Sequence, residues 1–581
     1  MLDVPVFTTL MLLLVARAHG DCLVSIAQGT ARGSLLTSYH GKEFCSYNGI
    51  PYAAPPVGDL RFRAPEPASA WTGELNATKP GNSCIQGALS FYFGDEDCLY
   101  LNVHTPQTST AEELLPVMVF IHGGAFIFGN GKAYSYGPHY LMDKEVVMVS
   151  MNYRLGVFGF LSTGDDAAPG NYAMKDQLEA LRWVQKNIAA FGGDPNKVTI
   201  MGESAGSMSV HFHILSPASR GLFHAAISDS GTAMMPMFLH AEGMLGVAQQ
   251  QAEAVNCPTD NTANMMECLR QVDAPSLIIH PPGACSTTEL ELRCFFDLMW
   301  RPVPETQSAL NPEPFLTAFP QDIIQSGNFS RVPYLIGTNG QEGALFLIPF
   351  IGTQNAVDKL NLNNSVLTDS SFFLEESVSD DLMPEIWNQI LDFYVGSNHT
   401  FSADNMHLLI DACTDRLMQH NTEKAVKLHT QAGHDTIYLY NLQYRGKYSF
   451  ITKARYGDLR YDLGVLHIDE LQYYISYGSD PNKWEAGHPD LEVLETVLTL
   501  WTNLAKYGHP TPSEENAPQG VVWPSVGAYQ DQLAYYLFGH QQPPIEPVDG
   551  IMPLNISVAR DLFSARMDFW NSLPLKENQY Q

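Results

Sequence analysis

The sequence predicts an α/β protein in which a large, mostly parallel sheet is flanked by helices on both faces. Two observations support this fold class. Apolar strand candidates alternate with helix candidates along the chain. In addition, the β-branched run that begins at Val198 leads through a glycine-flanked turn directly into the helix candidate Ala205–Leu215. A hydrophobic content of 45% fits a globular chain.

The expected elements follow in chain order. Helical spacing of three to four residues predicts a helix from Met174 to Ile188 that ends before Gly192 and Gly193. The same spacing predicts a later helix over Leu491–Leu504, stopped by Gly508. Strands are expected at Val117–Ile121, Val146–Met151, 198–201, Ala225–Ser228, Tyr334–Gly337 and Ile437–Tyr440. The less regular segments 255–315 and 350–400 are interpreted as insertions, so that 21–581 forms one domain.

Charge and the N-terminal segment indicate which partners and which cellular location to expect. The chain has 62 acidic against 32 basic residues, a net charge of -30, which disfavours nucleic acid and anionic membranes as partners. The apolar run Val6–Ala16 is followed by small residues at Ala18 and Gly20, which is typical of a secretory signal peptide over residues 1–20. We expect a secreted protein without a membrane span. Candidate glycosylation sites are Asn76, Asn328, Asn363, Asn398 and Asn555.

The cysteines agree with an oxidising compartment. Their number is nine, so at least one remains unpaired or pairs with another molecule. No cysteine or histidine spacing resembles a zinc site, and neither a metal nor a cofactor is expected. Short separations favour Cys84–Cys98, Cys257–Cys268 and Cys285–Cys294, with Cys22–Cys45 as a possible fourth pair and Cys413 left over.

The segment around Ser204 carries the strongest functional signal. Gly202 and Gly206 flank the serine in a Gly-x-Ser-x-Gly pattern, between a strand candidate and a helix candidate. Such a turn exposes the hydroxyl at the carboxyl end of a sheet and directs the N–H of Ala205 at a substrate oxygen. A bare match occurs often by chance, but the strand-then-helix context favours a serine hydrolase.

A serine nucleophile needs a base, a carboxylate that orients the base, and donors for the oxyanion. His467 lies in a loop-like segment after the last strand candidate, and Glu342 lies in a glycine-bounded loop after strand 334–337. Most glutamates are surface carboxylates, but this position follows the chain order of the nucleophile, acid and histidine in α/β-hydrolases. The glycine-rich turn after strand 117–121 supplies Gly124 and Ala125, which we expect to bind the oxyanion together with Ala205.

The chain resembles the carboxylesterase/cholinesterase family (type-B carboxylesterases), and most closely its secreted arthropod members. The resemblance extends from about residue 25 to 575. Besides the motifs above, it rests on Gly49–Gly58, Leu60–Pro65, Glu96–Val103, Gly170–Gln177, Phe191–Pro195 and Trp501–Asn503.

The resemblance implies an α/β-hydrolase fold and a Ser204/Glu342/His467 triad, the same residues that the motifs indicate. It also implies supporting roles. Ser230 would lie near the triad, and Glu203 would place a carboxylate beside the nucleophile or serve only as a structural group. Arg61 with Glu96 and Arg154 with Asp176 resemble structural ion pairs, and the family's disulfides correspond to Cys84–Cys98 and Cys257–Cys268.

Departures from the family pattern bear on the substrate, which is expected to be a small-molecule ester. The loop from Cys84 to Cys98 has no tryptophan, whereas cholinesterases bind quaternary ammonium on one there. Juvenile hormone esterases share the Gly-Gly-Ala-Phe turn but typically have glutamine where Glu203 stands. We therefore expect a general carboxylesterase, with a juvenile hormone or pheromone esterase as the specialised alternative. A non-catalytic adhesion protein and an organophosphate scavenger are the alternatives from other classes.

Overall fold

The computed structural model describes residues 22–88, 91–107, 113–239, 244–280, 300–351, 355–449, 463–476, 484, 487–528, 532–540 and 553–579. The expected signal peptide over 1–20 and the cysteines Cys285 and Cys294 lie outside these residues. Within the described ranges, no helix combines the length and the apolar character that a bilayer crossing requires.

An 11-stranded sheet forms the centre of the molecule, in the order β16-β15-β14-β13-β12-β11-β9-β10-β8-β4-β3. Strands β9 to β15 pair in parallel. The strand β16 at one edge, and β8, β4 and β3 at the other, pair antiparallel. The strands are β1 Leu23–Ile26, β2 Gly29–Arg32, β3 Ser34–Thr37, β4 Glu43–Pro51, β5 Glu74–Asn76, β6 Gln86–Ala88, β7 Phe91–Phe93, β8 Tyr100–Pro106, β9 Leu115–Ile121, β10 Val147–Met151, β11 Gly193–Glu203, β12 Ala225–Asp229, β13 Tyr334–Asn339, β14 Ile437–Leu442, β15 Ala534–Phe538 and β16 Ile556–Arg560.

The predicted strands are all present, and most extend one to several residues beyond their expected bounds. The helix predicted from Met174 is α2, and the helix after Ser204 has the expected bounds. The α-helices are α1 Gly156–Phe160, α2 Tyr172–Asn187, α3 Ala205–Leu215, α4 Pro236–Leu239, α5 Met244–Ala254, α6 Thr262–Gln271, α7 Ala274–Ile279, α9 Pro320–Ser326, α10 Ala344–Ile351, α11 Ala356–Leu362, α12 Leu367–Ser370, α13 Met383–Tyr394, α14 Met406–Thr414, α15 His420–Gln431, α16 Asp490–Tyr507 and α17 Ser564–Ser572.

Helices cover both faces of the sheet, which is why its central strands are apolar throughout. On β9, Val117 and Val119 belong to the core that includes α2 and α3, whereas Met118 and Phe120 belong to the core that includes α16. Helix α16 ends at Gly508, which has the left-handed φ of 70° that favours glycine at this position. Each central strand therefore contributes alternate side chains to two separate apolar layers.

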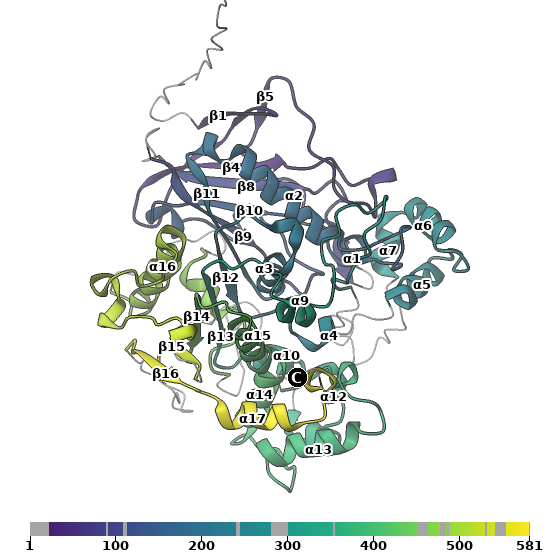
Figure 1. Cartoon of the computed structure of the whole chain (residues 1–581), viewed down its shortest axis with the longest axis vertical. Helices are drawn as coiled ribbons and strands as arrows, with labels where there is room; N and C mark the ends of the chain where they lie inside the picture. The colour runs from purple at the N-terminus through teal and green to yellow at the C-terminus, as the bar shows by residue number, and fades with distance from the viewer. Residues whose placement is uncertain are drawn as a thin grey trace, which may run out of the picture.

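The segment 350–400 differs from its sequence interpretation. Its sequence pattern is less regular than that of the strand and helix candidates, yet it contains α11, α12 and α13. In α13, Ile386, Ile390 and Tyr394 recur at helical spacing and are buried, and Pro384 lies in the first turn, where proline starts a helix rather than breaking it. Helices α13, α14 and α17 lie in the lower part of the view in Figure 1, and Phe393 of α13 stacks on Phe569 of α17.

Three disulfides are present among the described cysteines. They join Cys22 to Cys45, Cys84 to Cys98 and Cys257 to Cys268. Cys413 is buried with a free thiol on α14. The asparagines of all the candidate glycosylation sites are exposed.

Candidate active site

The candidate site lies at the carboxyl edge of the parallel strands. Strand register pairs Gly202 with Ile121, Glu203 with Asp229, and Asp229 with Gly337. The residues that follow β9, β11, β12 and β13 therefore come together along this edge, where ligands of open α/β sheets bind. The oxyanion candidates, Ser204, Ser230 and Glu342 all follow these strand ends.

Ser204 occupies a sharp turn between β11 and α3. Its φ of 58° and ψ of -124° are strained values for a residue with a side chain. A Cβ on Gly206 would lie 2.0 Å from the carbonyl oxygen of Ile121, and one on Gly202 would lie 2.5 Å from Gly206. The motif therefore needs glycine at both positions because backbone passes within van der Waals contact on both sides of the serine.

Glu342 and His467 form a buried, hydrogen-bonded pair. Nδ1 of His467 lies 2.6 Å from Oε2 of Glu342. The other carboxylate oxygen accepts hydrogen bonds from the Ser230 hydroxyl at 2.5 Å and from the backbone N–H of Asn339 at 2.6 Å. Since Glu342 is fully buried, these donors hold it in one orientation. Ser230 therefore contacts the candidate acid directly.

The loops that carry Glu342 and His467 are held together by hydrogen bonds. The N–H of Gln341 donates to the carbonyl of Val465 at 2.8 Å, and the N–H of Val465 donates back to the Gln341 side chain at 2.9 Å. The Asn339 side chain donates to the carbonyl of Leu466 at 2.8 Å. These bonds place His467 beside an acid that is 125 residues away in the chain.

Glu203 approaches the other nitrogen of the same histidine. Its Oε1 lies 3.1 Å from Nε2 of His467, within ion-pair distance. The two atoms are not aligned as a hydrogen bond, and within the described part of the chain neither has another hydrogen-bond partner. Nε2 therefore keeps its capacity to exchange a proton with a hydroxyl. Ser204 is the chain neighbour of Glu203, so the serine turn and the histidine meet here.

Burial determines the charge of the surrounding carboxyl groups. Desolvation raises the pKa of Glu203 well above its usual value, and the nearby charges of Glu470, Glu342 and Asp229 raise it further. The pKa of Glu470 is raised in the same way, although the Asn339 side chain donates a hydrogen bond to its carboxylate. These raised pKa values favour the protonated form of both glutamates over the form that each would have in water.

Asp229 and Glu470 are site residues that the sequence reasoning did not single out. Burial raises the pKa of Asp229 to about 6, while side-chain donors oppose that rise. These donors are the hydroxyls of Tyr440 at 2.8 Å and Tyr474 at 2.7 Å, and the Trp501 indole at 3.3 Å. Asp229 also accepts the N–H of Ser204 through its carbonyl at 3.0 Å. The one sequence signal was adjacency, since Asp229 precedes Ser230 and Glu470 closes the segment that contains His467.

The turn after β9 borders the serine. A Cβ on Gly123 would lie 2.7 Å from the carbonyl oxygen of Glu203 and 3.0 Å from Cβ of Ser204. Gly124 has a φ of 103° and Ala125 one of 54°. Within the described residues, the N–H groups of Gly124, Ala125 and Ala205 donate to no acceptor. These three donors are thus available to a ligand oxygen beside Ser204.

One partly buried and one fully buried ion pair lie in the described structure. Arg61 contacts Glu96 at 2.5 Å, and Arg154 contacts Asp176 at 2.7 Å. Asp176 is fully buried and also accepts the backbone N–H of Arg154. These are the pairs that the resemblance implies.

Comparison with known proteins agrees with this arrangement. Residues 21–570 match the sequence profile of the carboxylesterase family. The chain belongs to the carboxylesterase family. The family accounts for the α/β-hydrolase fold and identifies the protein as a carboxylic ester hydrolase.

Insect esterases are among the similar relatives of this carboxylesterase. It is 38% identical to a juvenile hormone esterase of Tribolium castaneum, over 87% of this chain and 86% of the relative. It is 36% identical to esterase FE4 of Myzus persicae, over 87% of each chain. The crystal structure of juvenile hormone esterase from Manduca sexta, with OTFP covalently attached, aligns with a TM-score of 0.78 and 27% identity. That alignment covers 95% of this chain and 99% of the other.

Proposed function

We propose that this carboxylesterase hydrolyses small-molecule esters through an acyl-enzyme on Ser204. His467 takes the hydroxyl proton as the serine oxygen attacks the ester carbonyl, and Glu342 orients the imidazole and stabilises its charged form. The N–H groups of Gly124, Ala125 and Ala205 bind the oxyanion. The observation that carries this proposal is the 2.6 Å contact between His467 and Glu342, with the opposite ring nitrogen unbonded beside the serine turn.

The two half-reactions balance in protons and bonds. In acylation, the proton from Ser204 passes through His467 to the departing alcohol as the ester C–O bond breaks. In deacylation, His467 takes a proton from water, the hydroxide adds to the acyl carbon, and the acid leaves as Ser204 regains its proton. Ser230 and Glu203 support this cycle by holding Glu342 and by filling the space beside the histidine.

Replacement of the nucleophile tests the proposal. Ser204→Ala is expected to abolish naphthyl acetate hydrolysis and labelling by a fluorophosphonate probe, while the protein is still secreted in folded form. A variant that still labels or turns over would assign the nucleophile elsewhere. Following naphthol release from naphthyl acetate over time with the unmodified protein also separates the alternatives. A scavenger releases one equivalent of product and stops, an esterase continues, and an adhesion protein does neither.

Juvenile hormone hydrolysis is the second candidate. The named relatives from Tribolium castaneum and Manduca sexta favour it, whereas Glu203 in place of glutamine favours a broader esterase. A panel that compares kcat/KM for a juvenile hormone ester, naphthyl acetate and p-nitrophenyl esters of increasing acyl length distinguishes the two. A hormone esterase prefers the first substrate by orders of magnitude.

We infer further that residues 21–581 form one secreted catalytic domain. The central sheet takes strands from Ser34–Thr37 through Ile556–Arg560, so the chain ends and the middle share one scaffold. Disulfides and exposed glycosylation sequons suit an oxidising compartment. N-terminal sequencing of the protein from culture medium tests removal of residues 1–20.

A further inference from the structure

We propose that Gln86 is a positioning residue for the oxyanion turn, through hydrogen bonds that connect the Cys84–Cys98 loop to Gly129. The inference rests on the proposed function, because it assumes that Gly124 and Ala125 bind the oxyanion. Gln86 lies 38 positions before Gly124 in the sequence and outside every motif described above.

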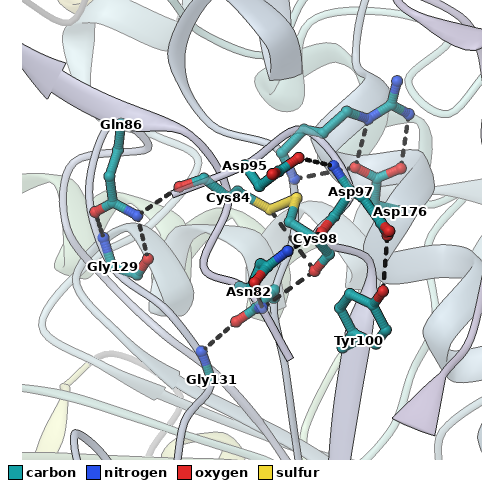
Figure 2. The surroundings of a disulfide bond; sticks show 12 residues. Asn82, Cys84, Gln86, Asp95, Asp97, Cys98, Tyr100, Gly129, Gly131 and Asp176 are labelled. Atoms are coloured by element: carbon teal, nitrogen blue, oxygen red, sulfur yellow. Dashed lines mark hydrogen bonds and ion pairs between the residues drawn. A yellow bond between two sulfur atoms is a disulfide. The ribbon is translucent and has the colours of Figure 1, made fainter. Parts of the chain in front are cut away.

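Both polar backbone atoms of Gly129 bond to the Gln86 side chain. Oε1 of Gln86 accepts the N–H of Gly129 at 2.9 Å, and Nε2 donates to the Gly129 carbonyl at 2.8 Å. Nε2 also donates to the carbonyl of Cys84 at 2.9 Å, next to the disulfide (Figure 2). Gln86 is only 2% exposed, so these bonds form away from competing water.

Gly129 packs directly against the start of the oxyanion turn. A Cβ on it would lie 2.3 Å from Nδ1 of His122 and 2.9 Å from the carbonyl oxygen of Gly123, and its φ is 116°. That histidine nitrogen is itself 2.8 Å from the same carbonyl oxygen. A shift of Gly129 therefore displaces the residues from which the turn begins.

The turn needs such external support because its own backbone is strained. Gly124, Ala125 and Phe126 have consecutive positive φ values of 103°, 54° and 61°. The N–H groups of Ile127 and Phe128 close the turn on the Gly124 carbonyl at 3.0 and 2.9 Å. Left-handed values at two non-glycine residues in succession persist only where the surroundings impose them.

Gly131, two residues after Gly129, has a separate set of hydrogen bonds that does not involve Gln86. The N–H of Gly131 donates to Asn152, and its carbonyl accepts from Asn102 and Ser150. Ser150 and Asn102 lie on the paired strands β10 and β8, so this anchor belongs to the sheet. The Gln86 anchor belongs instead to the disulfide loop, and it is the one nearer the oxyanion donors.

The test compares Gln86→Met with the control Gln185→Met. Methionine matches glutamine in length but has no strong donor or acceptor. Gln185 provides a matched loss, because its Nε2 donates to the carbonyls of Pro195 and Leu222, both at 2.9 Å, at the end of α2. The measurements are kcat and KM for naphthyl acetate, the thermal midpoint, and the inhibition constant of a trifluoromethyl ketone. That ketone forms a hemiketal whose oxyanion occupies the same donors.

Gln86→Met is expected to lower kcat by about 10- to 100-fold with KM changed less than about threefold, since misplaced donors act on the transition state. The ketone's inhibition constant should rise by the factor by which kcat/KM falls. Gln185→Met should change the thermal midpoint without changing kcat or the inhibition constant of the ketone. Unchanged kcat and inhibition constant in Gln86→Met, or equal losses in both variants, would overturn the inference.

Two further comparisons keep the result interpretable. If Gln86→Met fails to fold, Gln86→Glu replaces it, because glutamate keeps the acceptor for the Gly129 N–H and removes both donated bonds. Its expected losses in kcat and ketone affinity are the same in direction, and parental values would contradict the role of Gln86. Failure of the proposed function is recognised separately, because Ser204→Ala would then retain activity.

Discussion

Replacement of Glu342 by glutamine gives the sharpest test of the candidate triad. Oε1 of Glu342 accepts a backbone N–H from Asn339 at 2.6 Å, and Oε2 lies 2.6 Å from Nδ1 of His467. The backbone donor cannot reverse, so the oxygen of the new amide must stay on the Asn339 side. Its NH₂ group then faces His467, whose Nδ1 must become an acceptor. The proton moves to Nε2, and the imidazole can no longer take the proton of Ser204.

We expect Glu342→Gln to lower kcat by about 10³- to 10⁴-fold, which is about 4–5.5 kcal/mol in the activation barrier at about 1.4 kcal/mol per decade. The opposite orientation of the amide would not restore activity, because it is disfavoured: it places the amide NH₂ within 2.6 Å of the backbone N–H of Asn339, so that two donors face each other. The assay is kcat/KM for naphthyl acetate on purified protein, with the thermal midpoint as the folding check.

Ser230→Ala is the matched control for this variant. It removes one donor from the same carboxylate oxygen, the hydroxyl at 2.5 Å, but leaves the tautomer of His467 unchanged. Its loss should be no more than about tenfold. A folded Glu342→Gln protein with more than about a tenth of parental activity would refute the tautomer argument.

The remaining predictions concern charge. Because burial raises the pKa of Glu203, glutamine mimics its neutral form, and Glu203→Gln should change kcat/KM at pH 7 by less than about tenfold; a hundredfold loss would mean that a charged carboxylate is needed. Arg154→Met strands the buried Asp176 and should cost about 3–5 kcal/mol in urea unfolding, with Arg154→Met/Asp176→Leu recovering part of it; parental stability would contradict this. Burial lowers the pKa of His213 to about 3 from 6.5. The unfolded chain therefore binds a proton first, and stability falls as pH drops below 6.5, by about 2 kcal/mol from this residue between pH 7 and 5. His213→Asn should remove this part of the stability loss between pH 7 and 5. If the pH dependence of stability is unchanged in the variant, the prediction is wrong.

Local pattern predicts the parts of the candidate site that follow strand ends. Ser204 and Glu342 could be assigned because each follows a strand that the apolar pattern marks, and parallel strands bring such ends to one edge. His467 required more, since it follows no strand directly. Its position became predictable from chain order, and the structure accounts for its location through the bonds between Gln341 and Val465.

The residues that sequence reasoning missed act across long separations. Asp229 is held by Tyr440 and Tyr474, which are 211 and 245 residues further along the chain. Gln86 reaches Gly129 across 43 residues. Nothing in the spacing or composition around these residues reports such contacts, because they depend on where the loops fold. The segment 350–400 has a different cause, because the helical spacing of α13 is local and was overlooked among sequons and prolines.

Several residues of the candidate site have positive φ values, although their residue types do not predict this conformation. Ala125, Phe126, Ser204, Ser230 and Ile468 all have positive φ, and none is glycine. Each such residue costs about 1–3 kcal/mol, so neighbouring contacts must enforce the conformation. Here those contacts are hydrogen bonds between segments far apart in the chain: the Ser204 N–H donates to the Asp229 carbonyl, Gln341 and Val465 bond to each other, and the Gly129 N–H donates to the Gln86 side chain. Since these bonds orient strained loops and bury little apolar surface of their own, losing one affects the geometry of catalysis more than the stability of the fold.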